Sequence, residues 1–278
     1  MGMGSTVVEI EDYDSWPHDF RQTVLQYKDL ILSYHRERKR LDALCEDDVI
    51  LRSCPPANVY EADYKQLVAD LDGILSTRSI IGYHCTRLTP FEITSVKDNG
   101  LRALCPSLIQ ERINQAFKDK WLTQGEYDRL QMSSIILDNL DNKNGHRTGK
   151  IWLCPNRSTL RDSGAVHKLF RSWGGEAIFK GQADPMIMDT LCKTGLPCIV
   201  KCKLPFPDIN SFHTSHAERF VSKFVSRSIE YPHPSPAFDM SISRDLKTDE
   251  VLDIIVISNP AFAKLTGYET WMERYRIM

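Results

Sequence analysis

The sequence predicts an α+β protein in which helices precede a β-rich region. Apolar residues recur at helical spacing through residues 1–78, and short runs of β-branched residues alternate with helix start signals from residue 79 onward. A chain of 278 residues with 42% apolar content can bury a substantial core. We therefore expect a helical N-terminal extension over residues 1–78 and a second domain over residues 79–278.

The N-terminal extension is predicted to hold two amphipathic helices. Residues 1–16 are acidic and irregular, and apolar positions then follow helical spacing from Phe20 through Leu44. The prolines at 55 and 56 end this unit, and Tyr60 to Leu75 supplies the second helix. The apolar stripes of both helices must be buried against the core or against a partner.

The second domain is predicted to open with a strand over Ser79–His84. The helix Pro90–Asn99 follows, and Gly100 closes it because glycine readily adopts positive φ. Residues 106–140 then carry two further helix start signals, Pro106 and Thr123. We interpret this segment as a helical hairpin.

The remaining elements of the second domain alternate between strands and helices. Further strands are expected over residues 150–154, 176–179, 197–204 and 251–257, with a turn and helix over 155–170 and a helix from Pro185 to Lys193.

Charge and cysteine usage exclude several classes of protein. The 35 basic and 37 acidic residues leave a net charge of −2, which gives no general attraction to nucleic acid or membrane. The eight cysteines lack the paired spacing of a zinc site, so we expect no metal and reduced thiols in a cytoplasmic protein. The apolar runs are shorter than the roughly 20 residues of a membrane span.

Residues 83–87 read YHCTR, and the helix that follows ends at Gly100-Leu101. This segment resembles the first NAD-binding block of ADP-ribosyltransferases of the diphtheria-toxin and poly(ADP-ribose)-polymerase branch. In that family a strand carries Tyr-His-Gly-Thr or His-Gly-Ser, and the next helix ends in Gly-Ile or Gly-Leu. The chain departs from this pattern at Cys85, which stands in place of the usual glycine. The resemblance covers residues 79–257 and implies a split antiparallel β-sheet core, with residues 106–140 as a helical insertion.

The resemblance implies that Tyr83, His84 and Thr86 bind NAD, which is consumed as a substrate. A histidine on a strand offers a directional hydrogen-bonding group to ribose, and the threonine hydroxyl can support a ribose hydroxyl or fix the histidine tautomer. The structural alternative is a core histidine that bonds the backbone.

The second family block orients nicotinamide with an aromatic or serine element on the next strand. Trp152 and Ser158 lie in that order, although the family's customary tyrosine is absent. A core tryptophan is the alternative for Trp152.

The catalytic carboxylate of the family stabilises positive charge that develops on the ribose. Glu176 follows two glycines at the start of a β-rich run, where a charge is costly unless it is paired or used. The alternative is that Glu176 has no function and lies solvated at the end of a strand. Family members tend to carry this glutamate near the last strands, which makes Glu230 a rival, and Asp239 is a third candidate.

The resemblance therefore implies a NAD-dependent mono-ADP-ribosyltransferase that modifies a macromolecular acceptor, either protein or nucleic acid. It also implies a toxin or phage-defence setting, with a neutralising or regulatory protein partner and no membrane. The main alternative is an interaction protein whose active site has decayed. A cysteine hydrolase that pairs Cys85, Cys154 or Cys198 with His84, His167 or His213 ranks behind both. No phosphate-cradling glycine loop occurs in the sequence, which disfavours kinases and dinucleotide-binding α/β folds.

Overall fold

The chain divides into two compact units, each assembled from segments that are distant in sequence. The computed structural model describes residues 7–141, 147–161, 164, 166–210, 215–228 and 239–270. The first unit comprises residues 1–80, 205–207 and 211–237, and the second comprises 81–204, 208–210 and 238–278. The architecture is α+β, as predicted, with one sheet of strand order β1-β2-β4-β7 and a small sheet of order β3-β6-β5.

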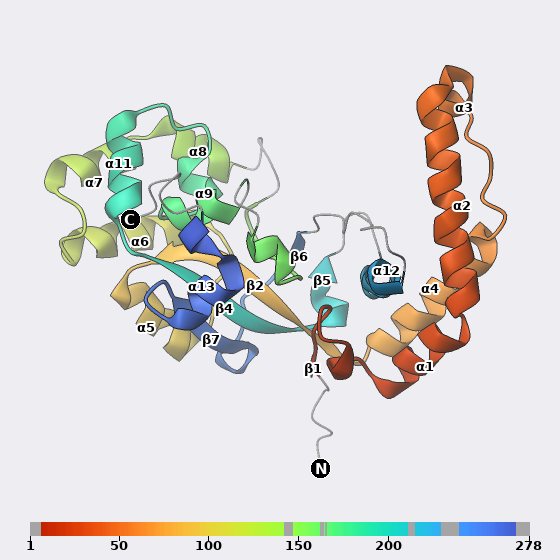
Figure 1. The fold of residues 1–278 in the computed structure, drawn as a ribbon. Coiled ribbons are helices and arrows are strands. Elements are labelled where there is room, and N and C mark those ends of the chain that lie inside the picture. The colour runs from red at the N-terminus through yellow and green to blue at the C-terminus, as the bar shows by residue number, and fades with distance from the viewer. Residues whose placement is uncertain are drawn as a thin grey trace, which may run out of the picture. The chain divides into compact units, whose positions relative to one another are not determined.

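Helices dominate the first unit. They are α1 (His18–Gln26), α2 (Lys28–Asp47), α3 (Val49–Ser53), α4 (Glu61–Leu75) and α12 (His216–Ser228). Helix α4 packs against α1, α2 and α12 (Figure 1). The rings of Trp16, Phe20 and Phe220 meet edge to face with centroids 5.2–5.5 Å apart. Helix α12, which the sequence analysis did not predict, therefore completes the core of the N-terminal helices.

Two predictions for the N-terminal residues are corrected. Within the segment expected to be irregular, β1 (Val7–Val8) pairs in parallel with the first two residues of strand β2. The single helix expected from Phe20 to Leu44 is broken at Tyr27, which leaves helical geometry with φ −99° and ψ 19°. The apolar spacing continues across the break, so the periodicity alone did not reveal it.

The strands of the second unit confirm most of the predicted β-runs. They are β2 (Ser79–Leu88), which starts in the first unit, β3 (Ile151–Leu153), β4 (Leu196–Pro205), β5 (Ile209–Asn210), β6 (Met240–Ile242) and β7 (Val251–Val256). Strands β4 and β7 are antiparallel, with Ile199 opposite Ile255. Strand β2 extends four residues beyond the predicted end at His84, which places the whole YHCTR segment inside the sheet.

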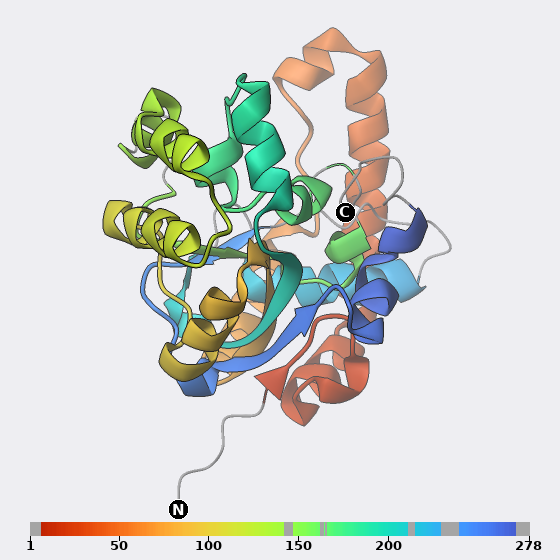
Figure 2. The ribbon, with the colours of Figure 1, turned by 90° about the vertical axis from the view of Figure 1, so that its left-hand side faces the viewer.

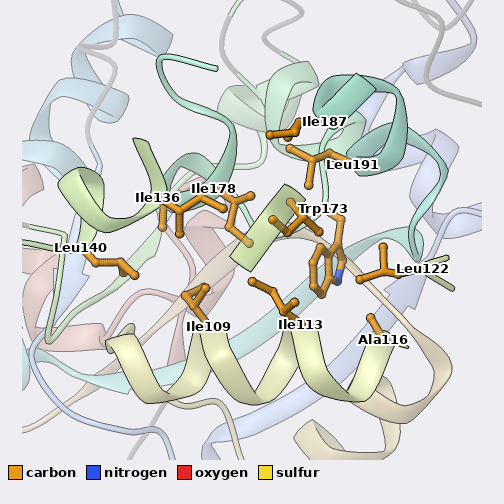
Figure 3. Close-up of a cluster of buried hydrophobic side chains, with 12 residues drawn as sticks. Ile109, Ile113, Ala116, Leu122, Ile136, Leu140, Trp173, Ile178, Ile187 and Leu191 are labelled. Carbon is orange, nitrogen blue, oxygen red and sulfur yellow. The ribbon is translucent and has the colours of Figure 1, made fainter. Parts of the chain in front are cut away.

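The predicted helical hairpin contains three helices. They are α6 (Pro106–Lys118), α7 (Gln124–Gln131) and α8 (Ser134–Leu140), and they gather with α11 (Pro185–Lys193) on one side of the second unit (Figure 2). Their apolar faces enclose the fully buried indole of Trp173, which lies between Ile113 of α6 and Leu191 of α11 (Figure 3). The other helices of this unit are α5 (Pro90–Asn99), α9 (Val166–Arg171), α10 (Glu176–Phe179) and α13 (Pro260–Thr266).

The strand expected over residues 176–179 is wrong, because these residues form the single helical turn α10. Gly174 and Gly175 both adopt positive φ and turn the chain, so that Ile178 enters the Trp173 cluster. The Asn139 side chain donates to the carbonyls of Ala177 and Lys180 and satisfies the end of the turn. Contacts from another helix, which the local sequence does not encode, therefore fix this element.

Gly100 ends α5 at a point where no side chain fits. Its φ is +83°, and a Cβ atom would lie 2.0 Å from the carbonyl oxygen of Leu246. We expect Gly100→Ala to lower the free energy of unfolding by at least about 2 kcal/mol, because it adds a steric clash to an unfavourable φ. Gly125→Ala, where nothing lies within 4 Å, is the matched control and should cost nothing. Urea denaturation of both variants measures the difference, and equal stabilities would contradict the prediction.

Candidate functional site

The predicted NAD-binding residues lie on β2, whose side chains alternate between two faces. His84 and Thr86 share the face of Gly82, and a Cβ atom on Gly82 would lie 2.3 Å from Met240 Cε. The small sheet therefore packs closely against this face. Cys85 points to the opposite face.

His84 is held by the first strand of the small sheet. Its Nδ1 lies 2.8 Å from the carbonyl oxygen of Trp152. A carbonyl only accepts hydrogen bonds, so Nδ1 carries the proton and donates it. Burial lowers the pKa of His84, and the charge of Arg112 acts in the same direction. The imidazole is therefore neutral at neutral pH, and its Nε2 is a hydrogen-bond acceptor.

The Nε2 atom of His84 has no hydrogen-bond partner within the part of the chain that the structure describes. The residue as a whole is partly accessible to solvent. On the same face, the buried Thr86 hydroxyl donates a long 3.4 Å hydrogen bond to the carbonyl of Arg87, and this is its one hydrogen bond among the described residues. The strand thus presents one neutral acceptor and one weakly engaged hydroxyl side by side.

The substitution of glycine by Cys85 leaves the His84 face clear. The Cys85 thiol is buried against the thiol of Cys154, and this contact together with burial raises the pKa of Cys85. Burial also raises the pKa of Cys198 to about 12. Both thiols are therefore protonated at neutral pH and are poor nucleophiles, which weakens the cysteine hydrolase alternative. His213 lies outside the described residues.

The other predicted cofactor residues lie on β2, on β3 and in the 3₁₀ turn that follows β3. Tyr83 is buried, and its hydroxyl accepts a long 3.4 Å hydrogen bond from Arg157. The Trp152 ring points to the face of β3 opposite Leu153, with the Lys150 ammonium 5.7 Å from its centroid. Ser158 is exposed at the start of a 3₁₀ turn. Among these residues, only the Trp152 carbonyl is joined to His84 by a hydrogen bond.

The sequence analysis missed a buried ionic cluster, which includes the Arg112 charge that lowers the pKa of His84. Glu92 accepts hydrogen bonds from the Thr89 amide at 2.7 Å and the Trp173 indole at 2.9 Å, and it forms an ion pair with Arg112. The Arg112 guanidinium also lies over the Trp173 ring, 5.0 Å from its centroid. The only local signal for this cluster is the capping box of Thr89 and Glu92.

Glu176 is the first residue of α10, where the positive end of the helix dipole stabilises a carboxylate. Its side chain is 45% exposed and forms an ion pair with Arg147 at 2.5 Å. No hydrogen bond or ion pair joins Glu176 to His84 within the described residues.

The two other candidates for the catalytic carboxylate are Glu230 and Asp239. Glu230 lies outside the described residues. Asp239 is exposed just before β6, and its charge acts on the Cys85 thiol.

No group of histidine, cysteine and acidic side chains within the described residues could hold a metal ion. All eight cysteines are free thiols. No helix among the described residues is both long and apolar enough for a membrane span.

Comparison with protein-family models, with curated proteins and with solved structures finds no match to this chain.

Proposed function

We propose that the protein is a NAD-dependent mono-ADP-ribosyltransferase with a split-sheet transferase core. The observation that carries the proposal is the neutral His84, whose Nε2 acceptor has no hydrogen-bond partner among the described residues while Nδ1 is fixed by the Trp152 carbonyl. A ribose hydroxyl is a donor that suits this acceptor. The neighbouring Thr86 hydroxyl offers a second contact on the same face.

The proposed reaction requires a carboxylate near the ribose. The bond between nicotinamide and ribose C1′ breaks, and its electron pair leaves with nicotinamide. Positive charge builds on the ribose, and a nucleophile of the acceptor attacks C1′ and loses a proton. Glu176 is our candidate for stabilising this charge, because its carboxylate is half-exposed at the start of α10, directly after two glycines. Arg147 would then orient the carboxylate.

The acceptor in this proposal is a macromolecule, either a protein side chain or a nucleic-acid base. A toxin or phage-defence effector, checked by a neutralising partner, fits such an activity in a cytoplasmic enzyme. Incubation with labelled NAD and a cell lysate, followed by separate nuclease and protease digestion, identifies the labelled class. Release of nicotinamide without acceptor measures the basal reaction.

We expect His84→Ala to abolish NAD binding while the fold is retained, because we propose that the side chain contacts ribose and does not fill the core, and its one hydrogen bond among the described residues is to the Trp152 carbonyl. His84→Asn is the sharper variant. Its amide can still donate to the Trp152 carbonyl, but it has no group at the position of Nε2. Calorimetric titration with NAD and thermal unfolding measure both properties. A variant with a lowered unfolding temperature that binds NAD normally would contradict the assignment of His84 to NAD binding.

The second candidate function is an interaction protein with a decayed site. The ion pair of Glu176 with Arg147 favours it, because a carboxylate held by an arginine is already neutralised. Such a protein neither binds nor hydrolyses NAD. The calorimetric titration of the unmodified protein therefore separates the two functions.

A further inference from the structure

A cleft of about 750 Å³ lies in the second unit, away from His84. Its walls are formed by Met188 and other residues of α11, by Trp121 in the turn after α6, and by the start of β4. Arg87 and Arg171 also line it. Arg87 projects from the face of β2 opposite His84, because the two residues are three positions apart on the strand. The cleft is therefore distinct from the proposed NAD site.

The charged side chains of the cleft differ in the partners that they contact. Lys193 and Asp189 form an ion pair with each other on α11. Arg87 donates to the carbonyls of Phe170, Thr194 and Gly195 at 2.7–3.1 Å, so its guanidinium is held by the backbone. Lys193 and Asp189 neutralise each other, so the remaining positive charge of the cleft comes from Arg87 and Arg171.

Arg171, the last residue of α9, carries an unsatisfied donor. Its Nε atom is buried and has no hydrogen-bond partner, and its guanidinium forms no ion pair within the described residues. A buried donor without an acceptor is unfavourable, and native structures rarely retain one without a reason. An anionic group in the cleft would satisfy it.

We propose that this cleft binds a nucleotide, with its phosphate on Arg171 and its base against Trp121 and Met188. A guanidinium matches the geometry of phosphate oxygens, and the half-buried Trp121 ring suits a planar base. The volume lies within the range of small-ligand sites. A free nucleotide and the phosphorylated 5′ end of a single-stranded nucleic acid present the same chemistry.

Calorimetric titration of the full chain tests the proposal with AMP, adenosine and inorganic phosphate. We expect AMP to bind saturably and the other two to bind at least tenfold more weakly. A 5′-phosphorylated trinucleotide and its unphosphorylated form identify the source. Tighter binding of the phosphorylated form than of AMP indicates a nucleic-acid end, whereas equal or weaker binding indicates a free nucleotide.

Arg171→Gln should weaken AMP binding at least tenfold. This substitution breaks no described hydrogen bond, so the fold should persist, and thermal unfolding checks this. Arg129→Gln on the exposed surface of α7 removes the same charge outside the cleft and should bind AMP normally. The proposal is overturned if the unmodified protein does not bind AMP, if binding survives Arg171→Gln, or if it is lost in Arg129→Gln.

Discussion

Replacing Glu176 by glutamine is expected to lower ADP-ribose transfer by about a hundredfold or more while NAD affinity is retained. The glutamine amide oxygen can still accept from Arg147, so the fold around α10 should persist. The loss arises because a neutral amide stabilises positive charge on the ribose less than a carboxylate does. Nicotinamide release and transfer to the labelled acceptor measure it, with calorimetry as the check on NAD binding.

Parallel variants decide which carboxylate carries the role. Glu230→Gln and Asp239→Asn should leave transfer near the level of the unmodified protein. Full activity in the Glu176 variant, together with a loss in one of these two, would transfer the role to that residue. Arg147→Gln is the control for the ion pair. If Arg147 only orients the carboxylate, this variant should lose less activity than Glu176→Gln.

Removing the Glu92 carboxylate is expected to be the most destabilising single change considered for the second unit. The side chains of Glu92 and Arg112 are only 10% and 15% exposed, and breaking such a pair leaves a buried charge without compensation. Glu92→Ala should therefore lower the free energy of unfolding by about 3–5 kcal/mol. Urea denaturation followed by circular dichroism measures the change.

Two further variants test the physical cause of this loss. Glu92→Met combined with Arg112→Met should recover part of the stability, because no charge is then left unpaired. Glu111→Ala removes an exposed partner of Arg102 and should leave stability unchanged within error. If Glu92→Ala lowers the free energy of unfolding by less than about 1 kcal/mol, the cluster does not stabilise the second unit as proposed.

Elements with local signals could be predicted from the sequence. The helix α5 begins and ends at the predicted residues, because Thr89, Glu92 and Gly100 supply a capping box and a positive-φ terminus within the segment itself. In contrast, α10 depends on the Asn139 side chain and on the packing of Ile178 against Trp173. No pattern within residues 176–179 carries that information.

The same distinction applies to the site. The YHCTR segment marked His84 because its residues are adjacent in sequence. The tautomer of His84 depends on Trp152, which is 68 residues away, and the indole contact of Glu92 spans 81 residues. Such pairings follow from the arrangement of sheet and helices, and one sequence alone does not give them. The roles proposed for Tyr83, Thr86, Trp152, Ser158 and Glu176 remain predictions.

The contacts of Arg87 also bear on how the chain folds as it leaves the ribosome. The carbonyls that hold its guanidinium include those of Thr194 and Gly195, which are 107 and 108 residues further along the chain. β4, which pairs with β2, is also synthesised later than β2. The N-terminal helices likewise pack against α12, which is synthesised long after them. During translation, β2 would therefore expose an unpaired edge and an unsatisfied arginine while more than a hundred residues are synthesised. Nascent chains of this protein should bind holdase chaperones until β4 emerges.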